Sequence, residues 1–170
     1  MSNCQDLGAQ VFRAVEKDLV LLGGATFLTE FGAETCSPVS GNSTECIAVM
    51  DLCTKHWISW INWPGSQLDP QHLGLSRPYA RALAGSPLNA SFAHDLPSKR
   101  FQLCFVVDTS ILASTEIYVD FDFYYPSGLS ITHSANIKYD VRRSSNTILV
   151  QPEDNNANGQ HACIAISSLS

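Results

Sequence analysis

The amino-terminal part of the chain alternates between helix-like and strand-like patterns of apolar residues. Between residues 5 and 22, apolar side chains recur at spacings of three and four: Leu7, Val11, Ala14, Val15 and Leu22. This spacing predicts an amphipathic helix that begins near Asp6 and ends at Gly23 and Gly24. The next run, 25–29, is apolar without clean alternation, which predicts a short strand that is buried on both faces of a parallel sheet and stops at 30–32.

The alternation of helix-like and strand-like patterns continues to about residue 85. A helix is predicted over 44–54, with Ile47, Met50 and Leu52 inside, and a second strand over 57–63, closed by a Pro-Gly pair. The Ser-Arg-Pro sequence at 76–78 is typical of a capped helix start, so a third helix is predicted from there to Gly85. Helices and strands in this order predict βα units of a parallel sheet.

Beyond Pro87 the pattern changes to short β-rich runs about ten residues apart, which is typical of an antiparallel β-sandwich. The predicted strands cover 99–107, 115–123, 129–132, 136–142, 147–151 and 161–167. Alternation of Ile117, Val119, Phe121 and Phe123 with polar residues predicts one buried face. The chain is therefore predicted to have two domains, 1–87 and 88–170, with a boundary near 86–90 and an exposed polar loop at 153–160.

The length and the net charge of the chain argue against several classes of protein. The 170 residues fall well short of the roughly 250 that a complete eight-stranded α/β barrel needs. With 10 Lys and Arg against 16 Asp and Glu, the net charge of −6 offers no attraction for nucleic acid or an anionic membrane. No apolar run is long enough to span a bilayer, so no integral membrane segment is expected.

Six cysteines and two N-glycosylation sequons, at Asn42 and Asn89, suit an oxidising secretory route. The first twenty residues nevertheless carry five charged side chains, so no export signal is visible: Asp6, Arg13, Glu16, Lys17 and Asp18. Loss of an export signal together with an upstream segment would reconcile these observations. Among the possible disulfides, Cys36 with Cys46 and Cys104 with Cys163 are the first expected pairs.

Candidate chemistry gathers on the two predicted strands of the first domain. Glu30 ends a strand at its carboxyl end, where α/β sheets place functional groups, and could act as a nucleophile or base, or merely cap the sheet or pair with an arginine. Period-two alternation puts Trp57 and Trp63 on one face and Trp60 on the other, so that only some of them can stack on a sugar and core packing is the alternative. Cys53 and His56 are at most a weak metal pair, and no nucleotide-binding or serine-hydrolase motif occurs.

Three segments together resemble consecutive landmarks of glycoside hydrolase family 5. They are Phe27–Ala33 with its Thr-Glu-Phe-Gly core, Trp60–Trp63, and Arg77–Tyr79 followed by Ala84–Pro87. Within that family, 115–118 and 125–128 resemble the carboxyl-terminal sandwich domain of the endoglycoceramidases. The Thr-Glu-Phe-Gly motif is the most specific of these elements.

The resemblance implies a TIM barrel whose seventh and eighth strands are 25–30 and 57–63, followed by a β-sandwich. It makes Glu30 the catalytic nucleophile and Trp63, with Trp60 beside it, a substrate-binding surface. The implied function is a retaining glycosidase that cleaves the O-glycosidic bond of glycosphingolipids without metal or organic cofactor, secreted or lysosomal as a full-length parent. The general acid and most of the barrel are absent, so a fragment inactive by itself is expected. The alternative is a non-catalytic sandwich module that binds glycolipid or carbohydrate.

Overall fold

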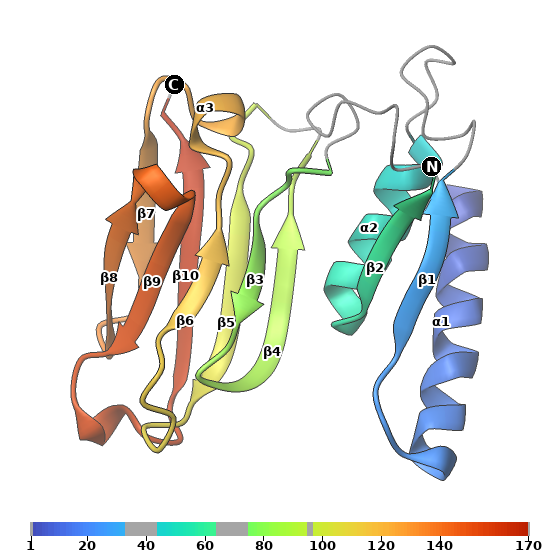
Figure 1. Ribbon diagram of the computed structural model, residues 1–170, viewed down its shortest axis with the longest axis horizontal. Coiled ribbons are helices and arrows are strands. Elements are labelled where there is room, and N and C mark those ends of the chain that lie inside the picture. Colours follow the sequence, from blue (N-terminus) through green and yellow to red (C-terminus); the bar gives the residue numbers. More distant parts are fainter. Residues whose placement is uncertain (1, 33–43, 64–74, 95–96, 170) are drawn as a thin grey trace. The chain divides into compact units, whose positions relative to one another are not determined.

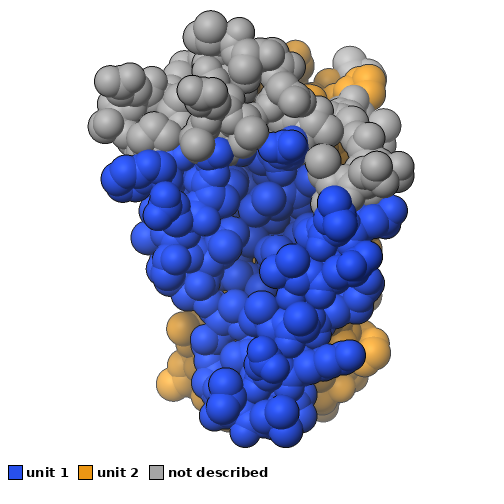
Figure 2. All heavy atoms as spheres, turned by 90° about the vertical axis from the view of Figure 1, so that its right-hand side faces the viewer, with its two compact units in different colours: residues 1–75 blue, residues 76–170 orange. Residues whose placement is uncertain are grey.

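The computed structural model describes residues 2–32, 44–63, 75–94 and 97–169. The chain divides into two compact units, 1–75 and 76–170 (Figure 1), which Figure 2 colours separately. The second unit thus begins at Ser76, ahead of the boundary that the sequence suggests. Each unit has its own secondary structure and its own buried residues.

The first unit contains a parallel strand pair with two helices. Its elements are α1 (Ser2–Leu22), β1 (Phe27–Gly32), α2 (Thr44–His56) and β2 (Ser59–Trp63). Both helices predicted here are confirmed, and α1 ends where Gly23 takes a positive φ of 71°. Strands β1 and β2 run parallel, with α2 lying between them in sequence (Figure 1). This is a βαβ arrangement, as the alternating pattern predicts.

One face of the strand pair is packed and the other is open. Cys46 and Met50 of α2 are buried, and Phe31 of β1 and Trp60 of β2 pack against them. On the opposite face, Phe27 is 49% exposed and Ile61 51% exposed. The prediction that the first strand is buried on both faces is therefore wrong for this chain, because its two helices cover only one side of the sheet.

The second unit consists of two four-stranded antiparallel sheets (Figure 1), consistent with the predicted β-sandwich. One sheet has the order β4 (Gly85–Phe92), β5 (Phe101–Val107), β10 (His161–Ser168), β7 (Leu129–His133). The other has the order β3 (Tyr79–Ala82), β6 (Thr115–Tyr118), β9 (Thr147–Pro152), β8 (Ile137–Arg142). The core includes the fully buried side chains of Phe101, Leu103, Ile117, Ile148, Ile164 and Ile166.

Two predicted elements of this unit are wrong. Residues 76–85 form no helix: β3 pairs with β6, and β4 begins at Gly85. Pairing with neighbouring strands overrides the helix propensity of this Ala-rich segment. The strand predicted over 115–123 ends at Tyr118, because the Asp120 carboxylate accepts the Phe123 N–H at 3.1 Å and caps a one-turn helix, α3 (Phe121–Tyr124).

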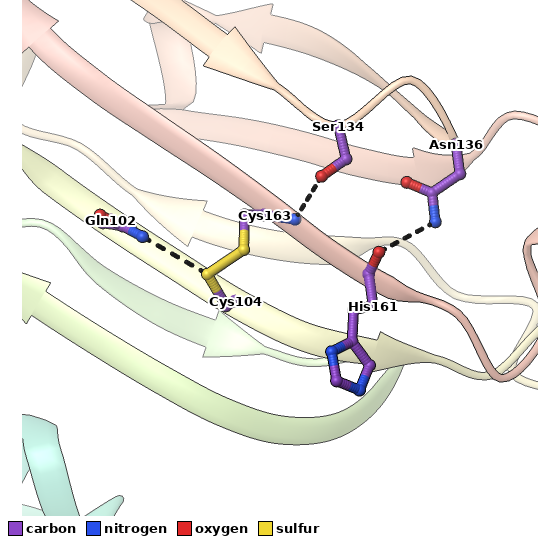
Figure 3. The surroundings of a disulfide bond; sticks show 6 residues. All are labelled: Gln102, Cys104, Ser134, Asn136, His161 and Cys163. Carbon is purple, nitrogen blue, oxygen red and sulfur yellow. Dashed lines mark hydrogen bonds between the residues drawn. A yellow bond between two sulfur atoms is a disulfide. The ribbon is translucent and has the colours of Figure 1, made fainter.

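A disulfide joins the two central strands of the first sheet. Cys104 of β5 and Cys163 of β10 are direct cross-strand partners, with Cα atoms 4.1 Å apart (Figure 3). The Cys163 N–H donates to the Ser134 hydroxyl at 2.9 Å, on the side away from β5. The predicted Cys104–Cys163 pair is confirmed. Cys46 is also disulfide-bonded, and Cys36, its expected partner, lies outside the described residues.

Candidate functional site

The candidate site lies at the carboxyl ends of β1 and β2. The two ends are level, since Gly32 of β1 pairs with Trp63 of β2. Glu30 lies within β1, two residues before its end, although the sequence predicts that the strand stops there. The loops that follow the two strands, 33–43 and 64–74, are outside the described residues.

A register irregularity exposes Glu30. Leu28 pairs with Trp60, whereas the next paired residue of β1 is Phe31, opposite Asn62. Two residues of β1 therefore lie between partners that are only two apart on β2, and both of them, Thr29 and Glu30, are exposed. Such a bulge redirects a side chain locally. It leaves the Glu30 carboxylate accessible on a strand whose other face is packed against a helix.

Gly32 allows the two strand ends to lie close together. A Cβ atom at this position would be 2.3 Å from the Trp63 carbonyl oxygen, and its φ of +128° disfavours any residue with a side chain. The Asn62 amide also donates to the Phe31 carbonyl at 3.3 Å, which ties β2 to β1 beside the bulge. Sequence reasoning did not identify Asn62, and its position between Ile61 and Trp63, one residue from the strand end, was the available signal.

The two tryptophans of β2 have different surroundings. Trp60 lies on the helix-covered face, where its ring meets Phe31 edge-on with centroids 5.2 Å apart. Trp63 alternates to the open face and is 58% exposed. Trp57 precedes the strand with a positive φ of 57°, so it has no place in the strand alternation. Of the tryptophans, Trp63 therefore shares the accessible side with Glu30, and a substrate contact of Trp60 stays a prediction.

Cys53 and His56, which the sequence offers as a weak metal pair, have separate surroundings in the structure. The His56 imidazole pairs with the Glu16 carboxylate of α1 and contacts the Phe12 ring, while Cys53 is buried. Together these contacts join α1 to α2. Across the described ranges, no group of three or more His, Cys, Asp or Glu side chains is placed to hold a metal ion.

A second aromatic feature lies on the outer face of the sheet that contains β3 and β6. Tyr79 and Tyr118 are cross-strand partners with ring centroids 5.3 Å apart, and Tyr79 is 43% exposed. The Arg81 guanidinium carbon lies 5.6 Å from the centre of the Tyr118 ring. Burial raises the pKa of the Tyr118 hydroxyl above its ordinary value. We call these three residues the tyrosine platform.

Several solved structures are similar to this chain. Endo-glycoceramidase II from Rhodococcus sp., solved as a lactosyl-enzyme intermediate, shares 22% identity over 98% of this chain and 39% of its own, with a TM-score of 0.73. The same enzyme in a ganglioside GM3 complex shares 20% identity over 91% and 34%, with a TM-score of 0.68. Sterylglucosidase 1 of Cryptococcus neoformans shares 13% identity over 98% and 32%, with a TM-score of 0.74.

At these identities the likeness concerns the fold, and the chain spans less than two fifths of the length of these proteins. No curated protein sequence matches this chain. No helix in the described part of the chain is both long and apolar enough to cross a membrane. Residues 77–166, more than half of the chain, match the glycoside hydrolase family 5 C-terminal domain, and the chain therefore belongs to glycoside hydrolase family 5.

Proposed function

We propose that this chain is the carboxyl-terminal part of a retaining glycosidase that hydrolyses the O-glycosidic bond of glycosphingolipids. In this proposal residues 1–63 form the last two βα units of a TIM barrel. The observation that carries it is the parallel β1–β2 pair, which presents Glu30 and Trp63 on its open side at the carboxyl ends of the strands. In α/β barrels, catalytic groups occupy this end of the strands.

Glu30 would be the nucleophile and Trp63 the floor under the reacting sugar. An ionised Glu30 carboxylate would attack the anomeric carbon and form a glycosyl ester, while the bond from that carbon to the ceramide oxygen breaks. The ceramide oxygen would leave with a proton from an acid, and water would then hydrolyse the ester. A retaining mechanism also needs a second carboxyl group, about 5 Å from the first, as acid and then base. The sequence has no Asn-Glu-Pro motif to supply this group. We therefore expect the isolated chain to be inactive and the complete barrel to be the working enzyme.

The substrate class and location are parts of the same proposal. A ganglioside complex is known for a similar structure, which supports a glycosphingolipid substrate here. The Cys104–Cys163 disulfide supports folding in an oxidising compartment, so the parent enzyme would be secreted or lysosomal. No metal or organic cofactor has a role in this mechanism.

Substitution of Glu30 in a protein that contains the complete barrel tests the proposal. Glu30→Gln keeps the shape of the side chain but cannot form the glycosyl ester, so turnover should fall by more than about 10³-fold with little loss of stability. Asp18→Asn, an exposed change on α1, is the matched control and should leave turnover unchanged. A mechanism-based fluorosugar should label Glu30. Full turnover by Glu30→Gln, or labelling elsewhere, would contradict the proposed role.

The tyrosine platform favours a second candidate function, a sandwich that binds carbohydrate without catalysis. Its exposed aromatic surface suits the apolar face of a sugar ring, and Arg81 can donate to sugar hydroxyl groups. Titration with the oligosaccharide of a glycosphingolipid separates the candidates. Binding that survives Glu30→Gln and Trp63→Ala but is lost in Tyr79→Ala favours the binding module.

A further inference from the structure

One sequon of the chain lies on a described strand and has no part in the proposed catalysis. Asn89 and Ser91 are two residues apart on β4, so their side chains lie on the same face of the sheet. Both residues are exposed, whereas Ala90 and Phe92 between and after them are buried in the core. The amide and the hydroxyl that define the sequon thus share the outer, solvent-facing side.

The strand that carries the sequon is the edge of its sheet. Among the strands that the structure describes, the order β4-β5-β10-β7 leaves β4 with β5 as its one partner within this sheet. Pro87 and a register irregularity between Pro87 and Asn89 interrupt the ladder immediately before the sequon. A bulky group on the outer face of an edge strand displaces no neighbouring strand, so the folded sheet can accept it.

Asn89 also lies in the same cross-strand row as the disulfide. Asn89 pairs with Cys104, and Cys104 pairs with Cys163, so the three side chains share one face on three adjacent strands. Figure 3 shows this bridge between β5 and β10, with the Gln102 amide 3.5 Å from the Cys104 sulfur. In a eukaryotic cell, a chain that forms this bridge in the secretory route passes through the compartment in which sequons are modified.

From these three observations we propose that Asn89 carries an N-linked glycan, whose first sugar lies over the outer face beside the Cys104–Cys163 disulfide. The donor is a lipid-linked oligosaccharide. A bond forms between the Asn89 side-chain nitrogen and the anomeric carbon of its first N-acetylglucosamine, while the bond from that carbon to the lipid pyrophosphate oxygen breaks. The lipid pyrophosphate leaves with the electron pair, and the nitrogen loses one proton to a base. The glycan then covers both the edge of the sheet and its disulfide.

The test uses the full chain, secreted from a eukaryotic host behind an added export signal. Trypsin cleaves after Arg81 and Lys99, and the peptide 82–99 contains Asn89 as its single asparagine. An amidase that hydrolyses the side-chain amide bond of a glycosylated asparagine releases the glycan as a glycosylamine and leaves aspartate, so mass spectrometry of this peptide reports occupancy at Asn89 alone. We expect most of the peptide to be converted. A secreted, folded chain whose peptide 82–99 is recovered unmodified overturns the proposal.

Two variants sharpen this test. Asn42→Gln removes the other sequon and should leave one glycan per chain, and adding Ser91→Ala, which keeps Asn89 itself, should remove that glycan.

The position of the glycan is tested by reduction of the disulfide, because exchange with a thiol depends on access to the sulfur. Dithiothreitol should open the Cys104–Cys163 bond faster after enzymatic removal of the glycan. Equal rates before and after removal would contradict the proposed shielding. None of these outcomes depends on glycosidase activity.

Discussion

Replacement of the Cys104–Cys163 disulfide by two alanines should lower the free energy of unfolding by about 4 kcal/mol. The bridged residues are 59 apart in sequence, and the chain-entropy relation gives about 4 kcal/mol for closing a loop of that length in the unfolded state. The folded state should change little, because the β5–β10 ladder continues on both sides, from His161 opposite Val106 to Ile166 opposite Phe101. Most of the loss therefore comes from the greater freedom of the unfolded chain.

Urea unfolding followed by far-ultraviolet circular dichroism measures this loss. The double variant Cys104→Ala/Cys163→Ala is preferable to chemical reduction, because Cys46 is also in a disulfide and would be opened by a reductant. Gln102→Ala is the matched control on the same face: it keeps the bridge and should change the unfolding free energy by less than about 0.5 kcal/mol. A folded double variant that loses less than about 1 kcal/mol would refute the loop-entropy reasoning.

Three further predictions concern packing and titration. Gly32→Ala should cost more than about 2 kcal/mol, because its Cβ would meet the Trp63 carbonyl, whereas Gly159→Ala, also at positive φ but with open space around it, should cost about 1 kcal/mol; urea unfolding of both variants checks this difference. Trp60→Ala should lower the unfolding free energy by about 2 to 3 kcal/mol and the exposed Trp63→Ala by less than about 1 kcal/mol, and a larger loss for Trp63 would assign it to the core instead of the substrate. Burial raises the pKa of Tyr124 from 10.0 to about 12, so the folded state keeps a proton that the unfolded state releases, and stability should fall as the pH rises from 10.0 to about 12. Tyr124→Phe should reduce that fall in urea titrations at increasing pH, and an unchanged pH profile would contradict the assignment.

The local sequence pattern was sufficient to predict a helix or strand where one face of that element packs against its own unit. The helical spacing in α1 and the apolar positions of α2 predicted both helices, and the evenly spaced β-rich runs predicted most strands of the second unit. The local pattern gave a wrong prediction where pairing with residues distant in sequence determines the secondary structure. The segment at 76–85 is rich in helix-forming residues, yet Ala80 lies opposite Ile117 of β6 and is held in a strand.

For the candidate site too, some features could be predicted from the local sequence pattern and others could not. A strand prediction sufficed to put Glu30 near a carboxyl end, and period-two alternation sufficed to separate Trp60 from Trp63. The bulge that exposes Thr29 together with Glu30 depends on the register between β1 and β2, which no local pattern contains. The bond from Asn62 to the Phe31 carbonyl is a consequence of that register and was equally out of reach.

The division of the chain at residues 75 and 76 also separates its chromophores. All three tryptophans, at 57, 60 and 63, belong to the first unit, and all five tyrosines, from Tyr79 to Tyr139, belong to the second. Fluorescence excited where only indole absorbs therefore reports on the first unit alone, and the change in phenol absorbance at high pH reports on the second. In the intact, unlabelled chain, the folding of each unit can thus be followed optically in the presence of the other.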